Sequence, residues 1–254
     1  MNKFIGIIPA RYASGRLPGK PLLDIGGKPM IERVVIQASK ALGSDNVWVA
    51  TDDSRIFDAV RTFGGNVVMT SEAHRSGTDR IAEAVNKIGT DADVVINIQG
   101  DEPFIDPEQI KLLAACFETP DTDIATLARP FDAAEGFEKL NDPNKVKVVT
   151  GEKGQALYFS RSVIPYLRCV EPKLWPATHR YLIHIGMYAY RTRVLNEITH
   201  LAPAPLETAE SLEQLRWLSN GYIVKVSLTD RVTIGIDTAE DLEEARRHCL
   251  ENNL

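Results

Sequence analysis

Residues 7–22 read IIPARYASGRLPGKPL, the end of an apolar strand followed by a loop with three isolated cations. The segment Phe4–Ile8 is rich in β-branched residues and stops at a proline, as a buried strand does. Arg11, Arg16 and Lys20 then lie among Pro, Gly, Ala and Ser. Small residues let a polyphosphate approach the backbone, and the cations neutralise its charge. The pattern alone leaves two readings open, a phosphate-binding loop and a solvated surface turn.

Outward from this stretch, strand-like and helical patterns alternate along the first half of the chain. Such alternation is typical of a parallel sheet covered by helices on both faces, with ligands at the carboxyl ends of the strands. We expect strands at 4–8, 46–50, 67–69 and 93–98, and helices after Pro29, after a cap at Asp52 or Asp53, over 78–88 and after Asp106–Pro107.

The pattern changes near residue 125. We expect strands at 125–130, 145–149, 156–160, 184–190 and 222–227, a hairpin turn at 151–154, a loop over 168–178 and one helix over 207–219. Near the C-terminus Asp237 is expected to end a strand, with Thr238 capping a last helix. The prediction is one α/β domain over 1–254, interrupted by a smaller mixed section at about 130–230.

Composition narrows the function classes. The net charge of −6 argues against a general nucleic-acid binder, which usually has a basic excess, although it says nothing about a single cleft. No apolar run approaches the roughly 18 residues that span a bilayer, and the N-terminus does not resemble a signal peptide. The three cysteines are scattered, as expected for reduced thiols. We therefore expect a cytoplasmic protein that binds neither nucleic acid nor membrane.

Two carboxylates follow expected strands, as the cationic loop does. Asp101 in NIQGDEP (97–103) comes just after one strand, where Gly100 lets the backbone turn without a Cβ clash, and Asp237 comes after another. Taken alone, each aspartate is as readily explained as a residue that forms a turn or caps a helix. Together with the cations, they predict Mg²⁺-assisted substitution at a phosphorus atom of a bound polyphosphate. The sequence lacks GxxxxGK[ST] and GxGxxG, which disfavours a P-loop ATPase and a Rossmann dehydrogenase.

Motifs in order along the chain resemble those of a known family. They are IIPARYASGRLPGKPL, ATDD, SGTDR, NIQGDEP, KVV, ALYFSR, HIGMYAYR, PLETAESLEQLR and GIDTAEDLE. The chain resembles the cytidylyltransferases that activate 3-deoxy-D-manno-octulosonate (Kdo) with CTP. The resemblance implies the reaction CTP + Kdo → CMP-Kdo + pyrophosphate, for lipopolysaccharide biosynthesis. It also implies a Rossmann-like nucleotidyltransferase (nucleotide-diphospho-sugar transferase) fold with a mostly parallel central sheet, a Mg²⁺ cofactor, and a homodimer formed through the 130–230 section.

The resemblance also implies residue roles at the nucleotide. Arg11 and Lys20 match the triphosphate-binding pair, and Asp101 and Asp237 match the metal ligands; these four are the implied catalytic residues. Cytosine would be read around Ala10 and in the stretch before GTDR. The full implied set of nucleotide contacts is Ala10, Arg11, Arg16, Lys20, Thr70, Arg75, Ser76, Gly77 and Asp101.

For the sugar, the resemblance implies contacts from Arg80, Gln99, Arg161, His184, Tyr188 and Glu213. One departure is visible: the family often has Arg where this chain has Ile183. We expect Tyr188 and Tyr190 to face opposite sides of their strand, so that at most one lines the sugar site. A histidine in an apolar strand is more often structural than catalytic, and we assign no general base.

Three alternatives remain open. One is a cytidylyltransferase for another ulosonic acid, such as amino-Kdo or a sialic acid. A GT-A glycosyltransferase is more remote, because such an enzyme normally carries a DxD-type motif. A non-catalytic nucleotide-binding protein has less need of two metal ligands, so the pair Asp101 and Asp237 counts against it.

Overall fold

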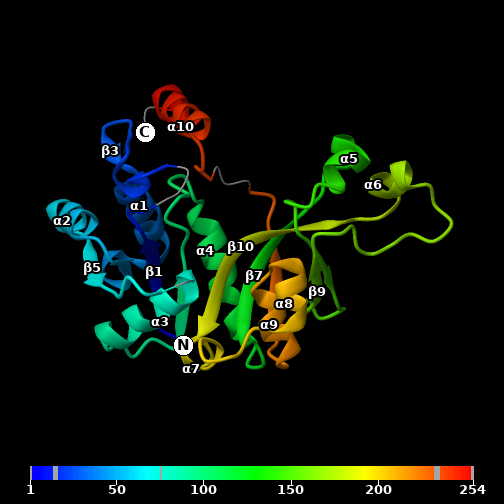
Figure 1. Ribbon diagram of the computed structural model, residues 1–254, viewed down its shortest axis with the longest axis horizontal. Helices are drawn as coiled ribbons and strands as arrows, with labels where there is room; N and C mark the ends of the chain where they lie inside the picture. Colours follow the sequence, from blue (N-terminus) through cyan, green and yellow to red (C-terminus); the bar gives the residue numbers. More distant parts are fainter. Residues whose placement is uncertain (1, 14–16, 75, 232–234, 253–254) are drawn as a thin grey trace. The chain divides into compact units, whose positions relative to one another are not determined.

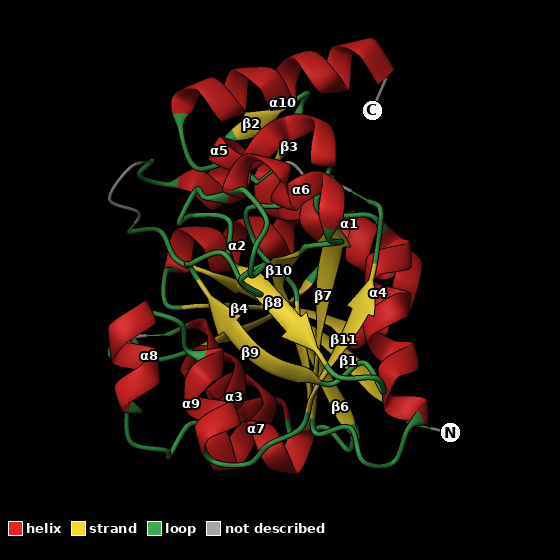
Figure 2. Cartoon of the chain, turned by 90° about the vertical axis from the view of Figure 1, so that its right-hand side faces the viewer, coloured by secondary structure: helices red, strands yellow, loops and turns green. Residues whose placement is uncertain are grey.

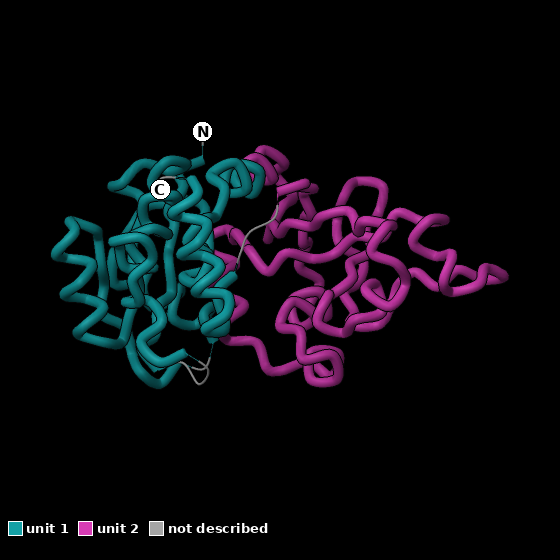
Figure 3. The backbone as a smooth tube through the Cα atoms, turned by 90° about the horizontal axis from the view of Figure 1, so that it is seen from above, with its two compact units in different colours: residues 1–114, 232–254 teal, residues 115–231 magenta. Residues whose placement is uncertain are grey.

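The computed structural model describes residues 2–13, 17–74, 76–231 and 235–252. The chain forms two compact units, shown in Figure 3: unit 1 comprises residues 1–114 and 232–254, and unit 2 comprises residues 115–231. The second unit starts about fifteen residues before the mixed section expected from sequence and ends next to its expected boundary. Unit 1 is therefore built from two separate stretches of sequence.

Unit 1 contains four parallel strands. They are β1 (Phe4–Ala10), β4 (Val47–Thr51), β5 (Asn66–Met69) and β6 (Val94–Asn97). Strand β1 pairs with β4 on one side and β6 on the other, and β4 pairs with β5 (Figure 1). Ile7, Ile8 and Val95 are fully buried, because strands of a parallel sheet covered on both faces are apolar on both sides. The predicted strands of this half are confirmed.

The helices of unit 1 begin close to their predicted starts. They are α1 (Met30–Leu42), α2 (Ser54–Thr62), α3 (Gly77–Ile88), α4 (Pro107–Ala115) and α10 (Ala239–Asn252). Asp53 rather than Asp52 caps α2, and Ser76 caps α3 by accepting a hydrogen bond from Asp79 N. The cap at Thr238 is confirmed, since its Oγ1 accepts from Asp241 N at 3.2 Å.

Helix α10 completes the core of unit 1. It lies beside the small hairpin of β2 (Asp24–Ile25) and β3 (Lys28–Pro29), as Figure 2 shows. Leu242, Ala245 and Cys249 pack there against Ile25 and Met30. The strand expected to end at Asp237 is not seen over residues 235–237, and residues 232–234 lie outside the described part.

Unit 2 has a mixed sheet. Its strands are β7 (Ile124–Pro130), β8 (Lys147–Thr150), β9 (Ala156–Ser160), β10 (Leu182–Arg191) and β11 (Val224–Leu228). Strand β7 pairs antiparallel with β10 and parallel with β11, while β8 pairs antiparallel with both β10 and β9. The turn joining β8 to β9 closes with Gly154 N donating to Gly151 O at 2.9 Å, which confirms the predicted hairpin.

The short helices of unit 2 correct two predictions. They are α5 (Gly136–Leu140), α6 (Trp175–Thr178), α7 (Thr192–Ile198), α8 (Pro205–Glu210) and α9 (Gln214–Ser219). The single helix expected over 207–219 is wrong, because Ser211 adopts a left-handed φ of 52° that ends α8. The loop expected over 168–178 contains a 3₁₀ turn and α6, anchored by the buried Trp175.

In the described part of the chain, no helix has both the length and the apolar character needed to cross a bilayer.

Candidate active site

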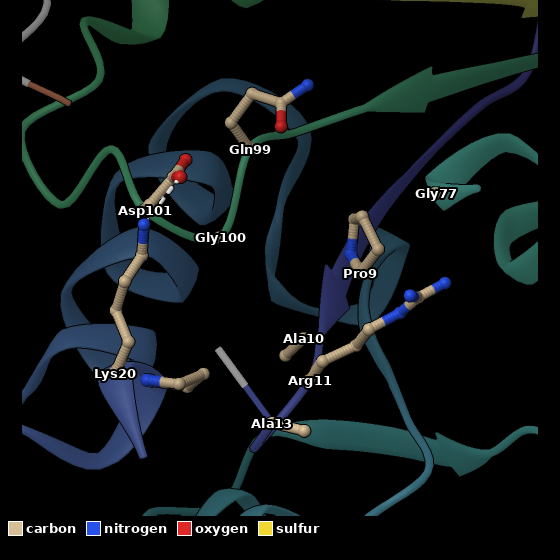
Figure 4. Close-up of a pocket in the computed structure, with 10 residues that line it drawn as sticks. Pro9, Ala10, Arg11, Ala13, Lys20, Gly77, Gln99, Gly100 and Asp101 are labelled. Atoms are coloured by element: carbon tan, nitrogen blue, oxygen red, sulfur yellow. Dashed lines mark hydrogen bonds and ion pairs between the residues drawn. The ribbon is translucent and has the colours of Figure 1, made fainter. Parts of the chain in front are cut away.

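A cavity of about 290 Å³ opens at the carboxyl ends of β1 and β6. This is the edge of a parallel sheet where ligands are expected. The loop after β1, the first residue of α3 and the loop after β6 all contribute to its wall. Figure 4 shows the lining residues, which are Pro9, Ala10, Arg11, Ala13, Lys20, Pro21, Gly77, Gln99, Gly100 and Asp101.

Lys20 lies between the two predicted metal ligands. Its Nζ is 2.8 Å from Asp101 Oδ2 and 3.0 Å from Asp237 Oδ1. The lysine side chain is 12% exposed, whereas the carboxylates are 35% and 52% exposed. A backbone hydrogen bond from Ile236 N to Asp101 O, 3.0 Å long, brings the two aspartate segments together. The structure therefore joins three of the four predicted catalytic residues, although they are far apart in sequence.

Two glycines shape the backbone around this cluster. A Cβ on Gly100 would lie 2.9 Å from the carbonyl oxygen of Pro9, so only glycine allows the loop after β6 to run this close to β1. This confirms the reason predicted for the glycine. Gly19 has a φ of 68° and donates its N–H to Tyr12 O at 3.0 Å, which folds the cationic loop back on itself and places Lys20 at the cavity.

The pair of aspartates suits a magnesium ion. Mg²⁺ prefers oxygen ligands and is usually held by one or two carboxylates together with substrate phosphates and water. Asp101 and Asp237 already contact one cation, the Lys20 ammonium, and both remain open to solvent. Among the described residues, no group of three or more His, Cys, Asp or Glu side chains is arranged to hold a metal. The donor set thus fits an ion that is bound jointly with a nucleotide.

Arg11 points away from this cluster, towards Gly77 in Figure 4. Its Nη2 donates to the carbonyl oxygen of His74 at 2.5 Å and lies 3.5 Å from that of Ser76. The predicted triphosphate ligand is thus linked to the stretch predicted to read cytosine. Arg16 and Arg75, which were also predicted to bind the nucleotide, lie outside the described residues.

Arg80 is buried instead of facing a sugar. Its side chain is 0% exposed, its Nη1 donates to Thr70 Oγ1 at 2.5 Å, and its Nη2 forms an ion pair with Asp52. Thr70 in turn donates to the carbonyl oxygen of Thr51 at 3.1 Å. The guanidinium has no exposed surface for a sugar in this conformation, contrary to the expectation. It holds the ends of β4 and β5 against α3, and so positions the predicted cytosine loop.

In unit 2, His184 is packed among aromatic rings. Its Nε2 is 3.0 Å from Thr126 Oγ1, and its ring lies 5.0 Å from that of Phe159 and 5.4 Å from that of Tyr188. Burial lowers the pKa of His184 to about 3, so the imidazole is neutral near pH 7. This environment suits a hydrogen-bonding group better than a proton carrier.

Tyr188 and Tyr190 lie on the same face of β10. Their rings are 6.1 Å apart, and both pack edge-on against Trp217, at 5.0 and 5.5 Å. The expectation that they face opposite sides is wrong, because residues two apart in a strand point to the same side. Tyr188 is only 8% exposed, and burial raises the pKa of its hydroxyl.

Arg161 is engaged with main-chain carbonyl groups. Its guanidinium donates to the carbonyl oxygens of Glu210 at 2.6 Å, Pro143 at 3.0 Å and Ser211 at 3.3 Å. Glu213, another predicted sugar ligand, is half-buried immediately before α9. The predicted sugar residues are thus divided between units: Arg80 and Gln99 belong to unit 1, and the other four belong to unit 2.

Sequence reasoning missed Glu83, on α3. Its Oε2 accepts a hydrogen bond from Ser71 N at 2.8 Å and contacts His74 Nε2, and its Oε1 is 2.7 Å from Lys87 Nζ. The spacing of four residues to Lys87 could have revealed the ion pair. Nothing in the local pattern indicates the contacts with the loop.

Comparisons with known proteins agree with one another. Residues 5–233 match the family model described as cytidylyltransferase. The chain is 59% identical to a 3-deoxy-manno-octulosonate cytidylyltransferase of Parabacteroides distasonis, over 96% of this chain and 97% of that protein. It is 47% identical to the protein of the same description from Escherichia coli, over 97% and 96% of the two chains.

A solved structure is also similar. CMP:2-keto-3-deoxy-manno-octonic acid synthetase, complexed with CTP, superposes with a TM-score of 0.88 at 45% identity, covering 98% of this chain and 99% of that one. The match confirms the predicted α/β nucleotidyltransferase fold.

Proposed function

We propose, from the premise that this chain belongs to the 3-deoxy-manno-octulosonate cytidylyltransferase family, that Lys20, Asp101 and Asp237 form its reaction centre. The reaction is the transfer of a cytidylyl group from CTP to Kdo, which yields CMP-Kdo and pyrophosphate and activates Kdo for lipopolysaccharide biosynthesis. The observation that carries the assignment is the meeting of these three side chains, two of which, Lys20 and Asp101, line the cavity beside β1 and β6.

The chemistry is a substitution at the α-phosphorus. The anomeric 2-hydroxyl oxygen of Kdo forms a bond to this phosphorus, the bond to the bridging oxygen breaks, and pyrophosphate leaves with the electron pair. The hydroxyl proton passes to solvent. Both substrates are anions, so positive charge at the cavity is needed to bring them together. Lys20 supplies positive charge directly beside Asp101, and Arg11 also lines the cavity.

Asp101 and Asp237 would hold a divalent cation on the triphosphate. When bound, Mg²⁺ neutralises phosphate charge and favours ionisation of the attacking hydroxyl. Lys20 occupies the space between the carboxylates in the structure. Its ammonium is therefore placed to exchange a carboxylate for a phosphate oxygen when nucleotide enters.

Unit 2 is the part that we assign to sugar binding and dimerisation. It contains Arg161, His184, Tyr188 and Glu213, and it exposes several large apolar side chains. Exposed large apolar side chains support an interface on this unit. Those of unit 2 are Leu157, Tyr166, Leu174, Leu206, Ile223 and Leu228. Light scattering of the purified protein tests the dimer, and a monomer at micromolar concentration would contradict it.

We keep the cytoplasm as the proposed compartment. The three cysteines form no disulfide with one another, and Cys116 and Cys249 are buried, as in a protein of a reducing environment.

A pyrophosphate-release screen tests the function. Purified protein is mixed with Mg²⁺, each of the four nucleoside triphosphates, and Kdo, an amino-Kdo analogue or a sialic acid. Release is expected with CTP and Kdo. Release with a different sugar acid, but not with Kdo, would move the assignment to a sister enzyme. No release with any pair would overturn the catalytic proposal.

Replacing either metal-ligand aspartate tests the reaction centre. Asp101→Asn and Asp237→Asn each remove a negative charge that the metal needs, so turnover should fall by about a hundredfold or more, as for loss of one transition-state-stabilising group. The matched control is Asp91→Asn, at a surface pair with Lys3 where the carboxylate is 80% exposed. Pyrophosphate release and circular dichroism give the two readouts. Turnover close to wild type in either variant would remove the metal role from that residue.

A further inference from the structure

Glu83 connects α3 to the loop that follows β5. Side chains of a helix lean towards its N-terminus, and this brings Glu83 back over the residues that precede α3. There its Oε2 accepts from Ser71 N at 2.8 Å and contacts the His74 ring. Within the loop, Ala73 N donates to Ser71 Oγ at 3.1 Å. One carboxylate oxygen therefore ties Ser71 and His74, two points of the loop between β5 and α3.

The other oxygen of Glu83 faces a fixed cation. Lys87 Nζ is 2.7 Å from Oε1, and the same ammonium donates to the carbonyl oxygen of Met69 at 2.9 Å, where β5 ends. Burial alone would raise the pKa of Glu83, but hydrogen bonds from Lys87, the Ser71 backbone and His74 outweigh it and lower the pKa to about 2. Glu83 is therefore a carboxylate near pH 7.

The loop is held from its other side by Arg11. His74 meets Glu83 through its side chain and accepts from Arg11 Nη2 at 2.5 Å through its carbonyl oxygen. Arg11 lines the cavity assigned to the triphosphate. A continuous series of contacts therefore runs from α3 through the loop to the phosphate side of the site.

We propose that Glu83 is a positioning residue that fixes loop residues 71–74 for recognition of the nucleotide base. The inference rests on the proposed function and on the expectation from the family resemblance that the stretch before GTDR reads cytosine. Cytosine and uracil differ in the donors and acceptors on one ring edge, so discrimination needs backbone groups at fixed places. Glu83 supplies this constraint without touching substrate.

The experiment compares Glu83→Ala and Glu83→Gln with Glu72→Ala. Glu72 lies in the same loop but is exposed, which makes it the matched control. Equilibrium binding of CTP and UTP is measured first, because it needs neither turnover nor the sugar acid. We expect Glu83→Ala to weaken CTP binding by about tenfold and to reduce the preference for CTP over UTP, with kcat changed less than KM, as for a displaced contact. Glu83→Gln, which keeps the acceptor for Ser71 N, should be intermediate.

If Glu83→Ala folds poorly, His74→Ala tests the same contact between Glu83 and the loop. It removes the side chain that Glu83 holds and leaves the carbonyl oxygen that Arg11 uses. It too should weaken CTP binding and CTP preference. Unchanged CTP affinity in the folded Glu83 and His74 variants would overturn the positioning role. A wild-type protein that binds CTP but releases no pyrophosphate would overturn the proposed function instead.

Discussion

One histidine, His184, packs among aromatic rings and should make the stability of unit 2 depend on pH. His184 is neutral in the folded protein because burial lowers its pKa to about 3, whereas a histidine in an unfolded chain titrates near 6.5. Between these values the unfolded chain binds a proton that the folded chain does not. The free energy of unfolding therefore falls as the pH is lowered from about 6.5 towards 3.

Removing this histidine should flatten that dependence. In His184→Gln the slope of unfolding free energy against pH, measured by urea denaturation between pH 6 and 4, should decrease by up to about 1.4 kcal/mol per pH unit, the value for one proton. His200→Gln is the control, because His200 is exposed. Equal slopes in wild type and the His184 variant would show that His184 does not take up that proton.

Other residues show which roles could be predicted from sequence. The position of Asp101 could be predicted because it lies in the loop just after a recognisable strand, β6, and strand ends meet at one edge of a parallel sheet. The positions of Arg80 and Arg161 could not be predicted, because their partners are brought to them only by the tertiary structure. Asp52 lies 28 residues from Arg80, and Glu210 lies 49 residues from Arg161.

At the scale of elements, the break between α8 and α9 differs most from expectation. Leu212 and Leu215 are both buried, so the apolar spacing continues across the break and predicts one helix. The break is formed by the left-handed φ of Ser211 and stabilised by Arg161, which donates hydrogen bonds to the carbonyl oxygens of Glu210 and Ser211. The strands were better predicted, since short apolar runs between turn residues identify them locally.

Glycine should be tolerated at the break and a β-branched residue should not. Ser211→Gly should leave stability unchanged or raise it by up to about 1 kcal/mol, because glycine reaches a left-handed φ without strain, whereas Ser211→Val should lower it by about 1–2 kcal/mol. Ser219→Gly is the contrast, because Ser219 is helical and the same change there should cost about 0.5–1 kcal/mol. Urea unfolding gives the values. A Ser211→Gly variant as destabilised as Ser219→Gly would argue against strain at the break.

At the scale of the whole molecule, unit 1 depends on a segment that follows unit 2 in sequence. Helix α10 buries Leu242 and Cys249 against the hairpin of β2 and β3. Asp237, two residues before that helix, belongs to the proposed metal site. The C-terminal segment therefore contributes both core side chains and a proposed metal ligand to unit 1.

Weakening the packing of α10 should destabilise unit 1 more than unit 2. Leu242→Ala should destabilise the protein by about 2–3 kcal/mol, the low end for a buried leucine, and should speed hydrogen exchange in β1 and β4 more than in β7. Leu250→Ala on the same helix is the control, since Leu250 is 78% exposed. Exchange that rises equally in both units would mean that they unfold together.

Because unit 1 is formed by two separate stretches of sequence, its parts are synthesised at different times. The strands of its sheet leave the ribosome first, but residues 235 onward follow only after about 120 residues of unit 2. At bacterial and eukaryotic elongation rates this delay is roughly 6–24 s. For that time Ile25 and Met30 lack their cover, and Lys20 has Asp101 but not Asp237 as a neighbour. A growing chain therefore exposes the apolar side chains of this hairpin before its reaction centre is complete.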